Sequence, residues 1–317
     1  MPELPEAQTT VNYLNRAHIL CARFVDAWSD WEKLIHPIKY REAIISPKAK
    51  LFDQAKKPDN FEEFKRIIKG KKIKKIWRRA KNIIFNLSDD YSILVHQKMT
   101  GHLLVGKWKI ENGKWKPTEK GALNDPYNRF LHIIFFLDNG LMLALSDARK
   151  FAKVELWKTE ELLNSKEFKA LGPEPLAKSF TFEEFRARLR PDGVSARRSK
   201  IKQVLMDQKK IAGIGNIYAS EILWRAKIHP EKNVAKLDEK ELKLLYQNIK
   251  KVLSLGVKLG GESFSDYRKP DGTKGDFDTE RKAYKREGQK CQRCGTKIKR
   301  IKVAQRSAFF CPHCQKL

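Results

Sequence analysis

The first six residues, Met1-Pro2-Glu3-Leu4-Pro5-Glu6, place two reactive groups next to each other at the start of the chain. If Met1 is removed, which a small second residue permits, the chain begins with the secondary amine of Pro2, and the Glu3 carboxylate follows. An α-amino group has a pKa of roughly 7.7 to 8.0, so part of it is neutral and nucleophilic at pH 7. Attack by a secondary amine on a carbonyl-like carbon gives an iminium, which withdraws electrons. Pro2 is therefore a candidate nucleophile and Glu3 a candidate proton carrier.

The same stretch also fits a purely structural role. Pro5 suits the first position of a helix, and the Glu6 carboxylate suits the positive end of the helix dipole. Taken alone, the stretch favours a helix start over a catalytic terminus, so the chemical interpretation depends on the rest of the chain.

Four of the five cysteines form two Cys-x-x-Cys pairs near the carboxyl end. The pairs Cys291/Cys294 and Cys311/Cys314 are separated by sixteen residues, a spacing typical of a four-thiolate zinc site. Four thiolates leave no open coordination position, so we expect one structural Zn²⁺. Residues 281–317 carry twelve Lys or Arg and a single acid. A basic solvated finger and a phosphate clamp both fit, and the one-sided charge favours the clamp, with Arg306 near the tip of a hairpin over residues 298–310.

The charge of the whole chain indicates a polyanionic partner. The 317 residues include 66 basic and 38 acidic side chains, a formal net charge of +28. Nucleic acid is favoured over a membrane surface, because no apolar run approaches the ~20 residues of a membrane span. The first residues also lack the basic and apolar regions of a signal peptide. We therefore expect a cytoplasmic protein that makes no membrane contact.

The sequence pattern predicts a strand-rich half followed by a helical half. A helix is expected over residues 5–17, short strands from residue 71 onward, and a hairpin turn at Asp138-Asn139-Gly140. Residues 171–176 contain two prolines and a glycine and are interpreted as a linker. Residues 26–70 predict no chemistry.

The helical half contains one motif with two interpretations. Gly213-Ile214-Gly215-Asn216 opens a predicted helix and offers backbone N–H groups to an anion. It lacks the preceding strand and third glycine of a dinucleotide-binding fingerprint. A simple turn and a phosphate site are equally supported.

Four separated motifs occur together in this order. They are residues 2–6, the Arg78-Arg79-Ala80-Lys81 run, the segment from Leu205 through residues 213–221 to His229-Pro230, and the finger with Ala304-Gln305-Arg306. Together they resemble formamidopyrimidine-DNA glycosylase, a bacterial base-excision family for oxidised purines.

The resemblance implies roles for four catalytic residues. Pro2 would attack C1′ of the damaged nucleotide, and Glu3 would act as the general acid for opening of the sugar ring. Lys81 would contact phosphate and assist β-elimination, and Arg306 would engage the phosphates that flank the lesion.

The resemblance also implies two groups of DNA contacts. Met99, Arg149 and Phe151 match the wedge residues that fill the space left by a flipped nucleotide. The residues that match contacts to the strand backbone are Arg197, Lys202 and Asn216.

The fold that the resemblance implies is of the α+β class. Residues 1–171 would form a β-sandwich flanked by helices, residues 172–280 a helix-two-turn-helix domain with a loop that caps the lesion, and residues 281–317 the zinc finger. Damaged double-stranded DNA would lie in the cleft between the domains of a monomer. The implied activity is a bifunctional glycosylase and abasic-site lyase acting through a Pro2 Schiff base with β,δ-elimination.

Two alternatives are kept. An endonuclease VIII-like enzyme for oxidised pyrimidines is disfavoured by Leu4 and by the wedge set. A non-catalytic, zinc-dependent protein that binds damaged DNA is disfavoured by intact Pro2, Glu3 and Lys81.

Overall fold

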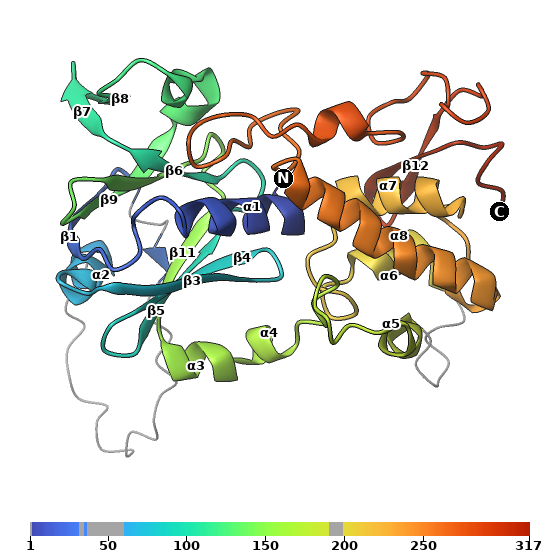
Figure 1. The fold of residues 1–317 in the computed structure, drawn as a ribbon, viewed down its shortest axis with the longest axis horizontal. Coiled ribbons are helices and arrows are strands. Elements are labelled where there is room, and N and C mark those ends of the chain that lie inside the picture. Colours follow the sequence, from blue (N-terminus) through green and yellow to red (C-terminus); the bar gives the residue numbers. More distant parts are fainter. Residues whose placement is uncertain (1, 32–34, 37–59, 190–198) are drawn as a thin grey trace, which may run out of the picture.

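The computed structural model describes residues 2–31, 35–36, 60–189 and 199–317. Arg197 therefore lies outside the described residues, as does most of the stretch 26–70. Strands fill the first half of the chain and helices most of the second, which confirms the α+β class (Figure 1). Within the described ranges, no helix combines the length and the apolar content needed to cross a bilayer.

The strands of the first half form a sandwich. One sheet has the order β1-β9-β10-β6 and the other β2-β11-β5-β4-β3, and a separate hairpin pairs β7 with β8. The bounds are β1 Phe24–Ser29, β2 Ile35–His36, β3 Ile73–Arg79, β4 Asn82–Leu87, β5 Tyr91–His96, β6 His102–Gly106, β7 Trp108–Glu111, β8 Lys114–Pro117, β9 Leu131–Leu137, β10 Met142–Ser146 and β11 Lys153–Lys158.

The core of the sandwich lies between the two sheets. Phe24 and Phe135 of the first sheet meet edge-to-face at 5.4 Å and share a buried cluster with Ile83 and Val95 of the second. β9 and β10 are joined by the expected turn at residues 138–140, where Gly140 has a φ of +77°. That hairpin prediction is confirmed, because glycine adopts this left-handed conformation without the strain of a Cβ.

Eight helices lie in the described part of the chain. Their bounds are α1 Leu4–Leu14, α2 Asn60–Ile68, α3 Thr159–Asn164, α4 Lys166–Lys169, α5 Phe182–Leu189, α6 Ile201–Met206, α7 Asn216–Ala226 and α8 Glu239–Lys258. Short 3-10 turns cover Ala122–Asn124, Pro126–Arg129, Val234–Lys236 and Phe277–Glu280. α1 begins and ends earlier than the predicted 5–17, and the Asn15 side chain after its last turn donates to Ile76 O at 3.1 Å.

Helix α1 lies at the centre of the molecule and connects its two cores (Figure 1). Val11 and Leu14 pack in the sandwich core, whereas Leu4 packs among the helices of the second half. The Leu4 amide also donates to Gly213 O at 3.0 Å. The first residues of the chain are consequently held between the two halves.

The carboxyl-terminal finger packs against α7. Its strands are β12 (Lys299–Val303) and β13 (Arg306–Phe310), so the expected hairpin over residues 298–310 is confirmed. The Glu221 carboxylate in α7 accepts hydrogen bonds from the backbone amides of Lys282, Ala283 and Tyr284. These bonds fix the start of the finger on the helical half.

Candidate active site

The side chain of Glu3 is completely buried and binds the amino-terminal end of α7. Its carboxylate accepts hydrogen bonds from Gly215 N at 2.7 Å and Ile217 N at 2.9 Å, and more weakly from Tyr218 N at 3.4 Å. The free amides at a helix start bind negative charge favourably. The backbone at residues 215–218 thus binds an anion, and that anion is the chain's own carboxylate, next to the buried Pro2.

A second buried carboxyl, that of Glu6, supports the first. It accepts hydrogen bonds from Glu3 N, from the Tyr218 hydroxyl and from Glu262 N, each at 2.7 Å. Burial raises the pKa of Glu6, and the negative charge of Glu3 raises it further. The two carboxyls at the terminus therefore have different tasks: Glu3 caps α7, and Glu6 fixes the backbone of Glu3 itself.

Lys81 lies on the tight turn between β3 and β4. Ala80 has a left-handed φ of +55°, and its amide donates to Glu174 Oε1 at 2.6 Å. Glu174 also pairs with Arg78 at 2.5 Å and with Arg79 at 3.0 Å. Burial lowers the pKa of Lys81, while the charge of Glu3 acts in the opposite direction. The turn therefore holds a partly desolvated amine within the electrostatic reach of Glu3.

An open cavity of about 610 Å³ separates this turn from the helices and the finger. Its lining includes Lys81, Lys202, Gly215 and Arg306, which come from all three parts of the chain. His96 also lines it, and burial followed by repulsion from nearby lysines lowers the pKa of His96 to about 3. The cavity is therefore lined by lysine and arginine cations and by a neutral histidine, as suits an anionic ligand.

Lys202 is the most buried of these cations. Its side chain is 1% exposed, and Nζ donates to Ser220 Oγ at 2.8 Å and to Ser307 O at 3.0 Å. Burial lowers its pKa to about 7, and Arg306 contributes to that decrease. The ammonium group is thus positioned by both α7 and the finger.

Met99, Arg149 and Phe151 form an exposed cluster on two adjacent loops of the sandwich. The Arg149 guanidinium lies 4.6 Å from the centre of the Phe151 ring and 3.4 Å from Met99 Sδ. Met99 is 41% exposed and Phe151 47% exposed. Asp147 supports the loop by accepting from the amides of Phe151 and Ala152, both at 2.7 Å. A rigid loop therefore holds apolar groups in solvent.

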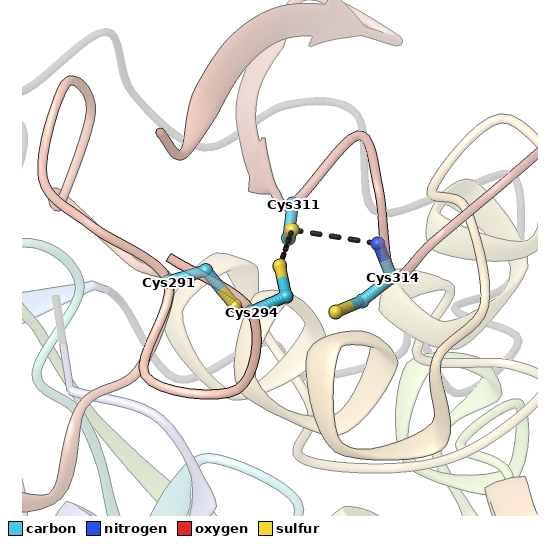
Figure 2. Close-up of side chains that lie close together, drawn as sticks. All are labelled: Cys291, Cys294, Cys311 and Cys314. Carbon is cyan, nitrogen blue, oxygen red and sulfur yellow. Dashed lines mark hydrogen bonds between the residues drawn. The ribbon is translucent and has the colours of Figure 1, made fainter. Parts of the chain in front are cut away.

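The four cysteine thiols lie within 4.8 Å of one another, and Cys294 Sγ is 3.4 Å from Cys311 Sγ (Figure 2). Four converging sulfurs at this spacing fit one tetrahedral Zn²⁺. In the hairpin beyond them, Ala304 and Gln305 adopt left-handed φ values of 47° and 61°. This turn places Arg306, the first residue of β13, on the wall of the cavity.

Comparison with known proteins agrees along the whole chain. Residues 1–154 match the model of the formamidopyrimidine-DNA glycosylase N-terminal domain, residues 171–268 that of its H2TH domain, and residues 288–317 that of the zinc finger found in FPG and IleRS. The formamidopyrimidine-DNA glycosylase of Desulforamulus reducens is 36% identical, over 100% of this chain and 99% of that protein. This chain belongs to the formamidopyrimidine-DNA glycosylase family.

Another relative and two solved structures of the family extend the comparison. The glycosylase of Pediococcus pentosaceus is 35% identical over the full length of both chains. The Lactococcus lactis enzyme in complex with DNA containing Fapy-dG gives a TM-score of 0.79 at 32% identity, covering 99% of this chain and 100% of that one. The same enzyme with DNA containing an abasic site gives the same TM-score, identity and coverages.

The structure of this glycosylase brings most of the residues singled out from sequence into one region. Lys81, Lys202 and Arg306 line a single cavity, and Glu3 is bound to Gly215 on its wall. Asn216 opens α7 directly beside Gly215. Met99, Arg149 and Phe151 form a separate exposed cluster on the sandwich. One structural Zn²⁺ belongs to the four cysteines.

Several residues that organise the glycosylase site were not predicted to do so. Glu6 was assigned only to the helix dipole, although it binds three groups. Glu174 in the linker and Tyr218 in α7 were not singled out, and neither was Glu262. A buried glutamate inside a linker of prolines and glycine carries no periodic signal. The one sequence signal for Glu6 is the repetition of Pro-Glu at residues 2–3 and 5–6, which could have indicated that Glu6 belongs to the same site as Glu3.

Proposed function

We propose that this glycosylase excises oxidised purines, formamidopyrimidines and 8-oxoguanine among them, from duplex DNA and then cleaves the strand at the abasic site. The observation that carries the proposal is the capture of Glu3 by the start of α7, which fixes the terminal Pro2 and its neighbouring carboxylate beside a cavity lined with cations. A nucleophile and a proton donor held together at a polyanion site can exchange a base for an amine at a sugar carbon.

In the first step, the nitrogen of Pro2 forms a bond to C1′ while the glycosidic bond breaks, and the base leaves with a proton taken from water. The Glu3 carboxylate takes up the proton that Pro2 loses on bonding and passes it to the ring oxygen, so that the sugar opens and an iminium forms between Pro2 and C1′. The iminium makes the C2′ hydrogens acidic. Loss of one C2′ proton expels the 3′ phosphate, and a second elimination expels the 5′ phosphate. Water then hydrolyses the iminium and frees Pro2.

The residues expected to contact DNA have complementary roles in this proposal. Lys81 contacts a phosphate of the damaged nucleotide and aids elimination, and Arg306 holds the phosphates on either side. Lys202 and Asn216 contact the strand backbone, as does Arg197. Phosphate oxygens are bound strongly by such groups, because the hydrogen bonds are charge-assisted.

The exposed cluster of Met99, Arg149 and Phe151 enters the duplex when the damaged nucleotide leaves it. Unstacking a base step costs a few kcal/mol, and a wedge offsets that cost by bending DNA around more protein surface. The rigid support from Asp147 reduces the ordering needed on binding.

We further propose the arrangement in which this chemistry is carried out. The boundaries are those expected from sequence, with the catalytic sandwich in residues 1–171, the helical DNA-binding domain in 172–280 and the zinc finger in 281–317. The protein acts as a monomer on damaged double-stranded DNA in the bacterial cytoplasm, and its finger holds the zinc ion in a purely structural role.

Borohydride trapping tests the proposed chemistry. The processed protein should form a covalent adduct with a duplex containing 8-oxoguanine, and Pro2→Gly should lower both adduct formation and base release by at least tenfold. Protein that retains Met1 is the matched control, since its nucleophile is blocked while the fold is unchanged. Tight binding without any trapped adduct would contradict the proposal and indicate a non-catalytic protein. Faster excision of oxidised pyrimidines than of oxidised purines would overturn the substrate assignment.

A further inference from the structure

A second open cavity, of about 590 Å³, lies on the sandwich outside the catalytic site. Its lining combines aromatic rings and cations, and we call it the hairpin pocket. The lining includes Trp28, Lys114, Trp115, Lys116, Arg129 and Phe130. None of them lines the catalytic cavity.

The hairpin pocket is next to the wedge loop. Phe130 O accepts a hydrogen bond from Asp147 N at 2.8 Å, and Asp147 is the residue that supports the wedge. Lys150, between the wedge residues, lies 4.0 Å from Asp30 on the wall of the pocket. β10 ends where β9 begins, at the pairing of Ser146 with Leu131. The pocket and the wedge therefore occupy the same end of the sheet.

The β7–β8 hairpin that forms one wall is anchored to the sandwich. Trp108 is 3% exposed and packs with Leu104 and Ile134 in a separate core cluster. At the other end of the hairpin, the Trp115 ring meets the Trp28 ring edge-to-face at 5.4 Å. The hairpin is thus fixed in position, and its tip cannot be regarded as an independent loop.

The charge of this wall is complementary to a phosphate backbone. Residues 107–120 contain five lysines and two glutamates, a net charge of +3. Lys116 pairs with Glu111 at 3.2 Å, but Lys114 and Arg129 have no ion pair with any residue that the structure describes. Both are exposed, and the Arg129 guanidinium lies 4.9 Å from the centre of the Phe130 ring, which limits its freedom. Two cations without an ion pair therefore flank half-buried aromatic rings, and cations of this kind bind the phosphate backbone of a duplex without reading its sequence.

We propose that the hairpin pocket is a second DNA-binding site that holds the duplex arm emerging past the wedge. Lys114 and Arg129 bind backbone phosphates of that arm, and the half-buried rings of Trp28 and Trp115 contact its sugars. The proposal rests on the function proposed above: when Arg149 and Phe151 enter the duplex, the base pairs next to the lesion lie against the adjoining surface of the sandwich. The pocket would then add affinity and orientation without adding lesion specificity.

The test compares Lys114→Ala/Arg129→Ala with wild type in binding to duplexes that carry a non-reactive abasic analogue. This ligand makes the result independent of covalent chemistry, so failure here is distinct from failure of the trapping experiment. The matched control is Lys240→Ala/Lys251→Ala on α8, which removes the same charge from another face. A thermal melt checks that each variant remains folded.

Each phosphate contact contributes about 0.9 to the slope of log affinity against log salt, so the double variant should lower that slope by about 1.8. We expect a five- to tenfold loss of affinity at 100 mM salt on a duplex with two long arms. Shortening one arm should abolish the difference between variant and wild type, and shortening the other should not. Equal affinities on all duplexes would overturn the proposal. An equal loss of affinity in the α8 control would also overturn it. So would a loss of affinity that does not depend on arm length, which is the result expected if the pocket binds an acidic peptide and not DNA.

Discussion

Replacing Gly215 with alanine should displace the Glu3 carboxylate without removing any charged group. Gly215 has φ −131° and ψ −156°, values that alanine adopts without strain, so the effect comes from the added Cβ alone. That atom would lie 2.4 Å from Glu3 Cδ and 2.5 Å from Oε1. Ordinary contact begins at 3.4 Å, so the carboxylate must move by about 1 Å (3.4 minus 2.4). A shift of that size breaks the hydrogen bonds from Gly215 and Ile217.

The expected magnitude follows from this displacement. Forcing an extra methyl group into a well-packed site costs about 1–3 kcal/mol. A catalytic group misplaced by roughly 1 Å can lose about 10²-fold in rate. We therefore expect Gly215→Ala to lower the free energy of unfolding by about 2 kcal/mol and to slow single-turnover base release about 100-fold.

A double-mutant cycle separates this mechanism from a general defect in folding. In an Glu3→Ala background the clashing atoms are absent, so adding Gly215→Ala should change the free energy of unfolding by less than about 0.5 kcal/mol. Gly140→Ala is the control, since Gly140 has φ +77° and no heavy atom within 4 Å of an added Cβ. It should lose about 1 kcal/mol through backbone strain and keep its rate. The reasoning is refuted if Gly215→Ala costs the same with and without the Glu3 side chain.

Three further predictions concern titration, metal and salt. Lys202 has a pKa of about 7 in the folded protein, against about 10.4 when unfolded. Between these two values the unfolded chain binds more protons than the folded one, so the free energy of unfolding should increase with pH. Denaturant unfolding at pH 7 and 9 should show wild type gaining stability relative to Lys202→Gln, by ~1.4 kcal/mol per pH unit at most. If the stabilities of the two proteins change equally with pH, the lowered pKa of Lys202 is contradicted. Removal of zinc by a chelator should unfold the finger and abolish lesion binding, while far-UV circular dichroism shows the sandwich still folded; full activity in metal-free protein would argue against this. With roughly six phosphate contacts, affinity for damaged duplex should fall about 10³-fold between 50 and 200 mM salt in an anisotropy titration, and a flat response would exclude an interface dominated by the backbone.

The features that could be predicted from the sequence depend on short-range spacing. The turn at residues 138–140 can be predicted from a glycine between two apolar runs, because only the positive φ of that glycine is needed. The zinc site can be predicted from two Cys-x-x-Cys pairs that flank a hairpin. The alternation of strands and helices follows the same local patterns. These predictions hold because few distant contacts compete with them.

The arrangement of the site depends on contacts between residues that are far apart in the chain. Glu3 binds Gly215 and Ile217, more than 200 residues away, and α7 offers the same amides to any anion of suitable shape. Sequence alone therefore left a turn and a phosphate site equally supported at residues 213–216. The burial of Lys202 was likewise invisible, because its two hydrogen-bond partners come from α7 and from the finger.

The connector between the two halves is attached on both sides. Gly172 N and Pro173 O form hydrogen bonds with Gln208 O and Ala212 N, at 2.8 and 3.0 Å, which join it to the helical half. One residue later, the Glu174 carboxylate binds Ala80 N and Arg78 and so holds the turn that carries Lys81. Any hinge motion between the two halves would therefore also move the turn that carries Lys81. Because the connector is bonded on both sides, it limits how far the sandwich and the helical half can separate at the cavity.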